Sequence, residues 1–334
     1  MADYLNAARD AGCATPILEW LAAGQALVPQ LPALAAEDWA ERRGGAHQLS
    51  DALAMEFTLP GPAECAVTDI RVPTRAGYLT VVHYRPPRVD GPRLAHLAFH
   101  GGGFLLGSVR EVINDRLWRA RAVAGGVDVF DVDYRLAPEH RFPAAIDDGL
   151  DALDWLVEHG PQFGIAPERI GVGGTSAGGN LAALIAMHAR DRGVRLDHQV
   201  LEVPAASLHA ERDQSFRDYS ELADMGGDFS ELRAAYLGTG NDSAGPTAPD
   251  EIADLSDLPA ALVITAELDP LRDSGEAYAT RLAAAGVPVQ SWRAPGQLHG
   301  SGALTRTSPT AREWQYRVSA FLRSRATLAV SIPS

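Results

Sequence analysis

Residues 170–180 read Ile170-Gly171-Val172-Gly173-Gly174-Thr175-Ser176-Ala177-Gly178-Gly179-Asn180 and decide the fold that we expect for this chain. The first residues favour a β-strand, and the apolar run from Ala177 onward predicts a buried helix. The Gly-x-Ser-x-Gly pattern between them is typical of a sharp strand-to-helix turn, which small residues allow to close. Such a turn strains the backbone of its serine and exposes the hydroxyl. Ser176 is therefore the candidate nucleophile.

Apolar segments and helical periodicities alternate along most of the chain. We expect a hairpin over residues 67–84, followed by strands at 94–99, 127–132, 169–172, 198–203, 261–266 and 287–292. Helices are expected at 146–156, 177–187, 278–285 and, after the last strand, 314–322. This alternation predicts an α/β fold, with a mostly parallel central sheet and helices on both of its faces.

Two segments fall outside this alternation. Residues 1–60 favour helices and loops, whereas residues 207–250 are polar and acidic with scattered aromatic residues. We expect these two segments to fold together as a helical cap. The core is then expected to consist of residues 61–206 and 251–328.

A second glycine-rich motif, His100-Gly101-Gly102-Gly103, directly follows a predicted strand. Glycines leave the backbone uncovered, so a substrate carbonyl can approach the N–H groups closely. The N–H groups of Gly102 and Gly103, with that of Ala177 after the candidate nucleophile, are predicted to bind an oxyanion. His100 is expected to hold this loop by hydrogen bonding rather than to act as a base.

A base and an acid are expected to complete this site. Among the histidines that follow Ser176, His299 alone comes after both a late strand and the acid candidates, and it is predicted to accept the serine proton. Asp269 follows a predicted strand, at the sheet edge where functional groups gather, although it also suits the N-cap of a helix. Glu267 and Asp273 are alternative acids.

Composition restricts the classes of partner. The 334 residues include 29 Lys and Arg against 43 Asp and Glu, a formal net charge of −14, which disfavours nucleic acid and anionic membranes as partners. Cys13 and Cys65 form no metal-binding or redox pattern, and no metal or cofactor is expected. Neither a signal peptide nor a membrane span is recognisable, so we expect a cytoplasmic protein.

Taken together, these motifs resemble the hormone-sensitive-lipase-type esterases, the bacterial family IV of the α/β-hydrolase superfamily. The resemblance covers most of the core and rests on five matching stretches, at residues 100–104, 133–140, 174–180, 269–273 and 299–300. Thr175 stands where many members have Asp, so the chain is most similar to the subgroup with a Gly-Thr-Ser-Ala-Gly turn. The cap segments match poorly.

The resemblance implies a carboxylesterase that cleaves short-chain, small-molecule esters through an acyl-enzyme without a cofactor or metal. It favours Asp269 as the acid of a catalytic triad with Ser176 and His299. It also implies a homodimer, because family members often pair through the last strand, here at 287–292, whose free edge invites pairing.

Side chains beside these motifs are candidates for further roles. Phe104, Leu105 and Tyr134 are candidates to line the acyl or alcohol pocket. Arg135 is expected to pair with a nearby carboxylate such as Glu139, because an unpaired buried charge is costly.

Two questions stay open at this point. Glu202 interrupts an apolar strand, and a buried carboxylate there needs a partner, which is either the substrate or an arginine. The same catalytic residues would also serve an amidase, a lactonase or a biosynthetic acyl-processing hydrolase. A non-catalytic small-molecule receptor on this fold is the remaining alternative, and the presence of His299 argues against it.

Overall fold

The computed structural model of the chain describes residues 2–87, 93–222, 229–238 and 245–328. These residues form a sheet of eight strands in the order β1-β2-β4-β3-β5-β6-β7-β8. The strands are β1 (Ala66–Thr74), β2 (Gly77–Arg85), β3 (Arg93–Phe99), β4 (Asp128–Val132), β5 (Ile165–Thr175), β6 (His198–Glu202), β7 (Ala260–Ala266) and β8 (Val289–Ala294).

The sheet is mostly parallel. Strand β2 runs antiparallel to both of its neighbours, β1 and β4, whereas the pairs from β4 through β3, β5, β6 and β7 to β8 are all parallel. Strands that are buried on both faces are rich in apolar residues, as β7 is. The α/β class and the parallel sheet expected from the sequence are confirmed.

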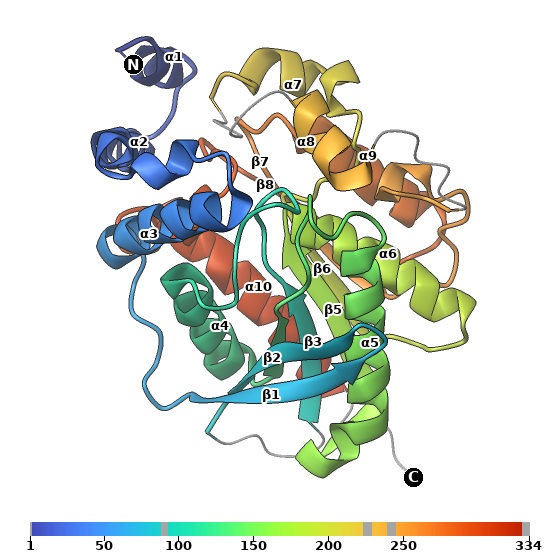
Figure 1. Cartoon of the computed structure of the whole chain (residues 1–334). Coiled ribbons are helices and arrows are strands. Elements are labelled where there is room, and N and C mark those ends of the chain that lie inside the picture. The colour runs from blue at the N-terminus through green and yellow to red at the C-terminus, as the bar shows by residue number, and fades with distance from the viewer. Residues whose placement is uncertain (1, 88–92, 223–228, 239–244, 329–334) are drawn as a thin grey trace.

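Helices cover both faces of the sheet (Figure 1). Helices α4 and α10 pack on each other over one face, and α5 and α6 do so over the other. The helices are α1 (Ala2–Asp10), α2 (Thr15–Leu27), α3 (Trp39–Phe57), α4 (Val112–Gly125), α5 (Ala144–His159), α6 (Ala177–Asp191), α7 (Gln214–Tyr219), α8 (Phe229–Leu237), α9 (Arg272–Ala284) and α10 (Pro309–Leu328), with short 3₁₀ turns at Val28–Gln30, Pro32–Ala35, Gly160–Phe163, Ala210–Arg212, Pro249–Glu251 and Ser301–Ala303.

The two segments outside the strand–helix alternation lie together above the sheet. In Figure 1, α1 to α3 and α7 to α8 sit at the same end of the molecule. They touch where the hydroxyl of Tyr4 donates to the carbonyl of Leu222 at 2.5 Å. Residues 223–228 and 239–244 of the expected cap segment 207–250 lie outside the described residues.

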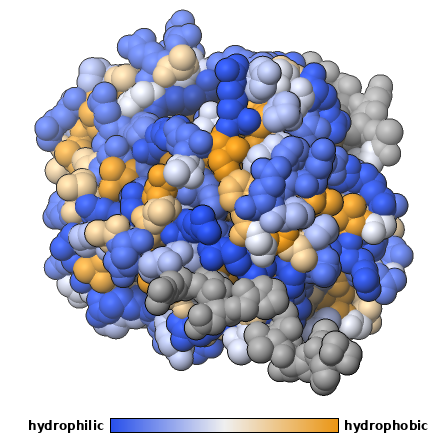
Figure 2. All heavy atoms as spheres, turned by 90° about the horizontal axis from the view of Figure 1, so that it is seen from below, coloured by the Kyte–Doolittle hydropathy of each residue, from blue (hydrophilic) through white to orange (hydrophobic). Residues whose placement is uncertain are grey.

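The surface is largely hydrophilic. The face drawn in Figure 2 shows polar residues interrupted by small apolar groups. Large hydrophobic side chains that are exposed in the described residues include Val28, Met55, Leu59, Tyr78 and Tyr316. In the same part of the chain, every helix is too short or too polar to cross a bilayer.

The strand ends determine where functional groups can gather. Strands β3 and β5 are parallel neighbours, and they end at Phe99 and Thr175, which directly precede the two glycine-rich motifs. Strands β7 and β8 end at Ala266 and Ala294, a few residues before the predicted acid and base. All four segments therefore leave the sheet at its carboxyl edge, as ligand sites in such sheets do.

Candidate active site

Ser176 lies at the sharp turn between β5 and α6. Its backbone has φ 57° and ψ −117°, a conformation that residues other than glycine rarely adopt. The turn is crowded: a Cβ atom on Gly174 would lie 2.4 Å from the Gly178 backbone, and one on Gly178 would lie 2.0 Å from the Phe99 carbonyl oxygen. The small residues of the motif are therefore required by backbone packing, and the strain at Ser176 is held by its neighbours.

The structure brings the predicted base and acid to this serine. His299 Nε2 lies 2.9 Å from Ser176 Oγ, and His299 Nδ1 lies 2.8 Å from Asp269 Oδ2. With Nδ1 donating to the carboxylate, Nε2 is free to accept the hydroxyl proton, which is the arrangement of a nucleophile, a base and an orienting acid.

Asp269 uses both of its oxygens. Oδ2 accepts from His299, and Oδ1 accepts from the backbone N–H of Leu271 at 2.8 Å, so the orienting and helix-capping roles coexist. The alternative acids are bound elsewhere: Glu267 accepts from the Gly296 N–H, and Asp273 accepts from the Ser215 N–H. The geometry thus singles out Asp269 as the partner of the imidazole.

The electrostatics of His299 follow from two opposed effects. Burial alone would lower the pKa of His299, because a charged imidazole is poorly solvated there. The charge of Asp269 and its hydrogen bond outweigh burial, so the pKa of His299 is raised above its ordinary value. The imidazole is therefore a stronger proton acceptor than a free histidine.

The His-Gly-Gly-Gly loop lies against the serine turn. Gly102 and Gly103 have φ of 120° and 61°, and a Cβ on Gly102 would lie 2.1 Å from the Leu106 carbonyl oxygen. A Cβ on Gly101 would lie 3.2 Å from the Thr175 carbonyl oxygen, so the loop and the serine turn are in close contact. Ala177 begins α6, where first-turn N–H groups have no partner within the helix.

His100 keeps this loop in place by a hydrogen bond and a ring contact. Its Nδ1 donates to the Gly101 carbonyl at 2.8 Å, and its ring stacks on Tyr134 with centroids 4.3 Å apart. The Tyr134 hydroxyl donates in turn to the His100 carbonyl. Burial lowers the pKa of His100 to about 4, so it is neutral at physiological pH and acts as a hydrogen-bonding group.

The comparisons with known proteins agree with this geometry. Residues 96–302 match a family model described as the alpha/beta hydrolase fold. The chain belongs to this family. Among its relatives, the esterase LipI of Mycobacterium tuberculosis is 39% identical over 266 residues, which span 76% of this chain and 80% of LipI.

Two further relatives extend the comparison. The ethyl acetate hydrolase of Pseudomonas putida is 35% identical over 303 residues, or 84% of this chain and 88% of that enzyme. A solved esterase from the hyperthermophilic archaeon Pyrobaculum calidifontis superposes with a TM-score of 0.78 at 39% identity, covering 87% of this chain and 94% of that one. The chain is thus a carboxylesterase of the hormone-sensitive-lipase-like group.

The side chains predicted to line the substrate pocket of the esterase are buried. Phe104 is 1% exposed, and its ring stacks on Tyr236 of α8 with centroids 3.8 Å apart. Leu105 is also buried, and Tyr134 lines an outer cavity rather than the one beside Thr175. Phe104 and Leu105 both belong to the buried core, which is the alternative to a pocket-lining role, and that role stays a prediction.

The expected partner of Arg135 is also corrected. Arg135 pairs with Asp148 on α5 at 2.8 Å, and Asp148 is almost fully buried. Glu139 instead accepts from Arg43 of α3 at 2.6 Å. Arg43 also donates to the carbonyls of Leu105 and Ala137. The N-terminal segment is thus fastened to the loop that follows the glycines.

Glu202 is bound by an arginine. The two terminal nitrogens of Arg121, Nη1 and Nη2, donate to its carboxylate at 2.8 and 2.7 Å, and Trp314 Nε1 donates at 2.6 Å. These groups come from β6, α4 and α10 and are buried. The carbonyl of Glu202 also accepts from the N–H of Ser176 at 2.9 Å. The ion pair therefore fixes Glu202 at the end of β6, and the Glu202 carbonyl in turn holds the Ser176 amide.

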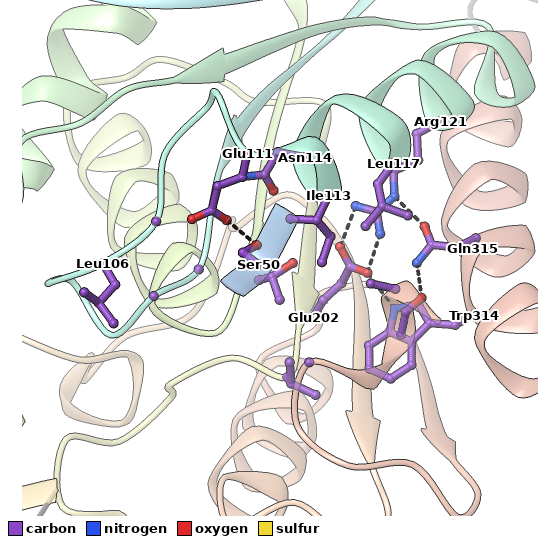
Figure 3. Close-up of a pocket in the computed structure, with 18 of the residues that line it drawn as sticks. Ser50, Leu106, Glu111, Ile113, Asn114, Leu117, Arg121, Glu202, Trp314 and Gln315 are labelled. Carbon is purple, nitrogen blue, oxygen red and sulfur yellow. Dashed lines mark hydrogen bonds and ion pairs between the residues drawn. The ribbon is translucent and has the colours of Figure 1, made fainter. Parts of the chain in front are cut away.

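A cavity of about 280 Å³ lies beside these groups, and we call it the Glu202 cavity (Figure 3). Its walls include Gly101, Gly102 and Thr175 from the catalytic loops, and Gly300 next to the base. Ser50 of α3 and Glu111, the residue directly before α4, also line it. Sequence analysis missed Ser50 and Glu111, since they belong to no motif and only the packing of the cap segment on α4 brings them there.

Within the described residues, no cluster of three or more His, Cys, Asp or Glu side chains is arranged to hold a metal ion. Cys13 and Cys65 are free thiols, and burial raises the pKa of both to about 11. They are therefore protonated at physiological pH and unreactive.

Proposed function

We propose that this carboxylesterase cleaves short-chain esters through an acyl-enzyme formed on Ser176, with His299 as base and Asp269 as its orienting acid. The observation that carries the proposal is the unbroken hydrogen-bonded line from Ser176 Oγ to His299 to Asp269. The raised pKa of His299 supports the same roles, because it favours proton transfer from the serine.

The steps follow from these positions. Ser176 Oγ attacks the ester carbonyl carbon while its proton passes to His299 Nε2. The N–H groups of Gly102, Gly103 and Ala177 stabilise the negative oxygen of the tetrahedral intermediate. When the carbon–oxygen bond breaks, His299 returns the proton to the leaving alkoxide. Water then gives a proton to His299 and attacks the acyl-enzyme carbonyl carbon, and His299 returns that proton to Ser176 Oγ as the acid is released.

Short acyl or alcohol groups are favoured by the size of the site. The Glu202 cavity holds about 280 Å³. Because a cavity of about 150 Å³ binds benzene, this volume suits about ten carbon atoms rather than a long lipid chain. The similarity to an ethyl acetate hydrolase supports the same substrate class. We expect kcat/KM for aryl esters to be highest between acetyl and hexanoyl, and a higher value for a dodecanoyl ester would contradict this.

A burst experiment tests the acyl-enzyme directly. Mixing the protein with an activated acetate should release one equivalent of the phenol before steady turnover begins. A fluorophosphonate should label Ser176 and abolish both phases. Turnover without a burst would leave the acyl-enzyme unsupported, and labelling of a different serine would show that the site lies elsewhere.

We also propose that two copies pair through β8. This strand lies at one edge of the sheet and pairs only with β7 in the described part of the chain. Light scattering should give the dimer mass, and Gln290→Glu with Ser291→Asp should shift it toward monomer through charge repulsion. A monomer in the parent protein would rule out the dimer. The cytoplasmic location stays a prediction, which cell fractionation tests.

A further inference from the structure

The Glu202 cavity is lined by immediate chain neighbours of the catalytic groups. Gly101 and Gly102 belong to the predicted oxyanion loop, Thr175 precedes the nucleophile, and Gly300 follows the base. We place one substituent of an ester bound at Ser176 in this cavity. The polar groups on its far wall then decide which substituents are accepted.

Two glutamates line this cavity, and they differ in how they are neutralised. Glu202 receives two hydrogen bonds from Arg121 and one from Trp314, so its charge is fully compensated. Glu111 receives one hydrogen bond on Oε2, at 3.1 Å from Ser50 Oγ, within the described part of the chain. Figure 3 shows the two carboxylates apart from each other, with Glu111 beside Ser50 and Glu202 beside Arg121.

Two arginines line the cavities that Glu111 faces, but both pair with other glutamates: Arg121 with Glu202, and Arg43 with Glu139. The charged groups that act on Glu111 are His47 and Asp51 of α3, and these two lie 3.3 Å apart and pair with each other. Burial raises the pKa of Glu111 to about 7, with the Ser50 hydrogen bond acting in the opposite direction. A cation placed beside this carboxyl would favour its ionised form and gain a charge-assisted hydrogen bond.

We propose that Glu111 is a specificity-determining residue that selects esters bearing a protonated amine on the group that occupies the Glu202 cavity. The inference rests on the proposed function, since the amine must be held while Ser176 attacks the carbonyl. The acidic net charge of −14 would also attract such cationic substrates to the protein.

Matched substrates isolate the amine. The first pair is 2-(dimethylamino)ethyl acetate and its carbon analogue 3-methylbutyl acetate, which place the charge in the alcohol. The second pair is ethyl 4-(dimethylamino)butanoate and ethyl 5-methylhexanoate, which place it in the acyl group. The ratio of kcat/KM within each pair is measured at neutral pH, and the pair that shows the effect tells which part of the ester enters the cavity.

The variant Glu111→Gln removes the charge and keeps both the size and the acceptor for Ser50. We expect it to lower the amine-to-carbon ratio about tenfold in at least one pair, mainly through KM, while the carbon analogue changes less than about twofold. Competitive inhibition by N,N-dimethylbutylamine should weaken to a similar degree. Glu111→Asp, which keeps the charge, should retain more of the preference than Glu111→Gln.

Two control variants separate this role from general effects. Glu56→Gln removes one exposed charge from α3 and should leave both ratios unchanged. Ser50→Ala removes the hydrogen bond but keeps the carboxylate, so the amine preference should persist. Equal ratios in the parent protein and Glu111→Gln, or an equal loss in Glu56→Gln, would overturn the proposal. Failure of the parent to cleave the carbon analogues would instead contradict the proposed function.

Discussion

The two walls of the active site are built in different ways. The wall that carries Ser176 and the oxyanion loop consists of short segments at strand ends, and its shape is fixed by backbone contacts such as those at Gly102 and Gly178. Beyond Gly101, Gly102 and Thr175, the Glu202 cavity is lined mainly by side chains of α3, α4 and α10 and their neighbours, and these form the second wall. Backbone geometry thus provides the chemistry, and side-chain placement provides stability and selectivity.

The largest expected effect is on the backbone-built wall. Ser176→Ala should lower kcat by about 10⁴-fold or more for every ester, because the nucleophile is lost while the oxyanion site remains. Steady-state kinetics and loss of fluorophosphonate labelling measure this. Ser207→Ala, which alters a buried serine outside the site, serves as the control and should change kcat only slightly. Activity of Ser176→Ala near the parent level would contradict the assignment.

The next largest effect is on folding stability, and it concerns the wall that is built from side chains. Arg121→Met leaves the Glu202 carboxylate buried with Trp314 as its remaining partner, so the free energy of unfolding should fall by about 3–5 kcal/mol. Urea denaturation measures this change. Arg192→Met breaks an exposed pair with Asp154 and should cost about 1 kcal/mol or less. Equal effects of the two substitutions would show that burial of the Arg121 pair is unimportant.

A smaller loss of kcat is expected for glycine substitutions in the oxyanion loop. Gly102→Ala places a methyl group against the Leu106 carbonyl and strains a φ of 120°, so kcat should fall about 10²–10³-fold through displacement of the loop. Gly103→Ala meets only the flexible end of Leu232 and should be milder. Kinetics and circular dichroism of both variants distinguish loop displacement from unfolding, and the reverse order of effects would refute this account.

The smallest expected effect is on the pH dependence of kcat/KM. Below the pKa of His299, the imidazole is protonated and cannot accept the serine proton, so kcat/KM should fall tenfold per pH unit. Because this pKa is raised, the decline should begin above about pH 6.5, the ordinary histidine value. Asp269→Asn removes the charge that raises it, so the acid limb of the residual activity should move to lower pH. An unmoved limb would assign the titration to another group.

The sequence alone predicts most of one wall and little of the other. The turn at Ser176 and the strand before His100 are local patterns, in which spacing and glycines constrain the backbone within a few residues. The structure brings Ser176, Asp269 and His299 together as the sequence led us to expect, because each follows a strand of one parallel sheet.

The partners of the buried charges could not be predicted in the same way. Arg121 and Glu202 are 81 positions apart, and Arg43 and Glu139 are 96 apart, so neither pairing follows a local period. Arg135 has a carboxylate nearby in sequence at Glu139, yet it pairs with Asp148 because α5 folds back beside it. Such choices depend on how helices pack, and the sequence pattern does not specify this.

The link from Trp314 through Glu202 to the amide of Ser176 has a consequence for synthesis. Domains begin to form while the chain is still emerging from the ribosome, N-terminal parts first. The serine turn, however, obtains its support and its imidazole from residues near position 300 and beyond. A nascent chain that ends before residue 299 therefore carries a nucleophile without its base, and one that ends before Trp314 also lacks this partner of Glu202, so hydrolytic competence arises only after these residues have been added.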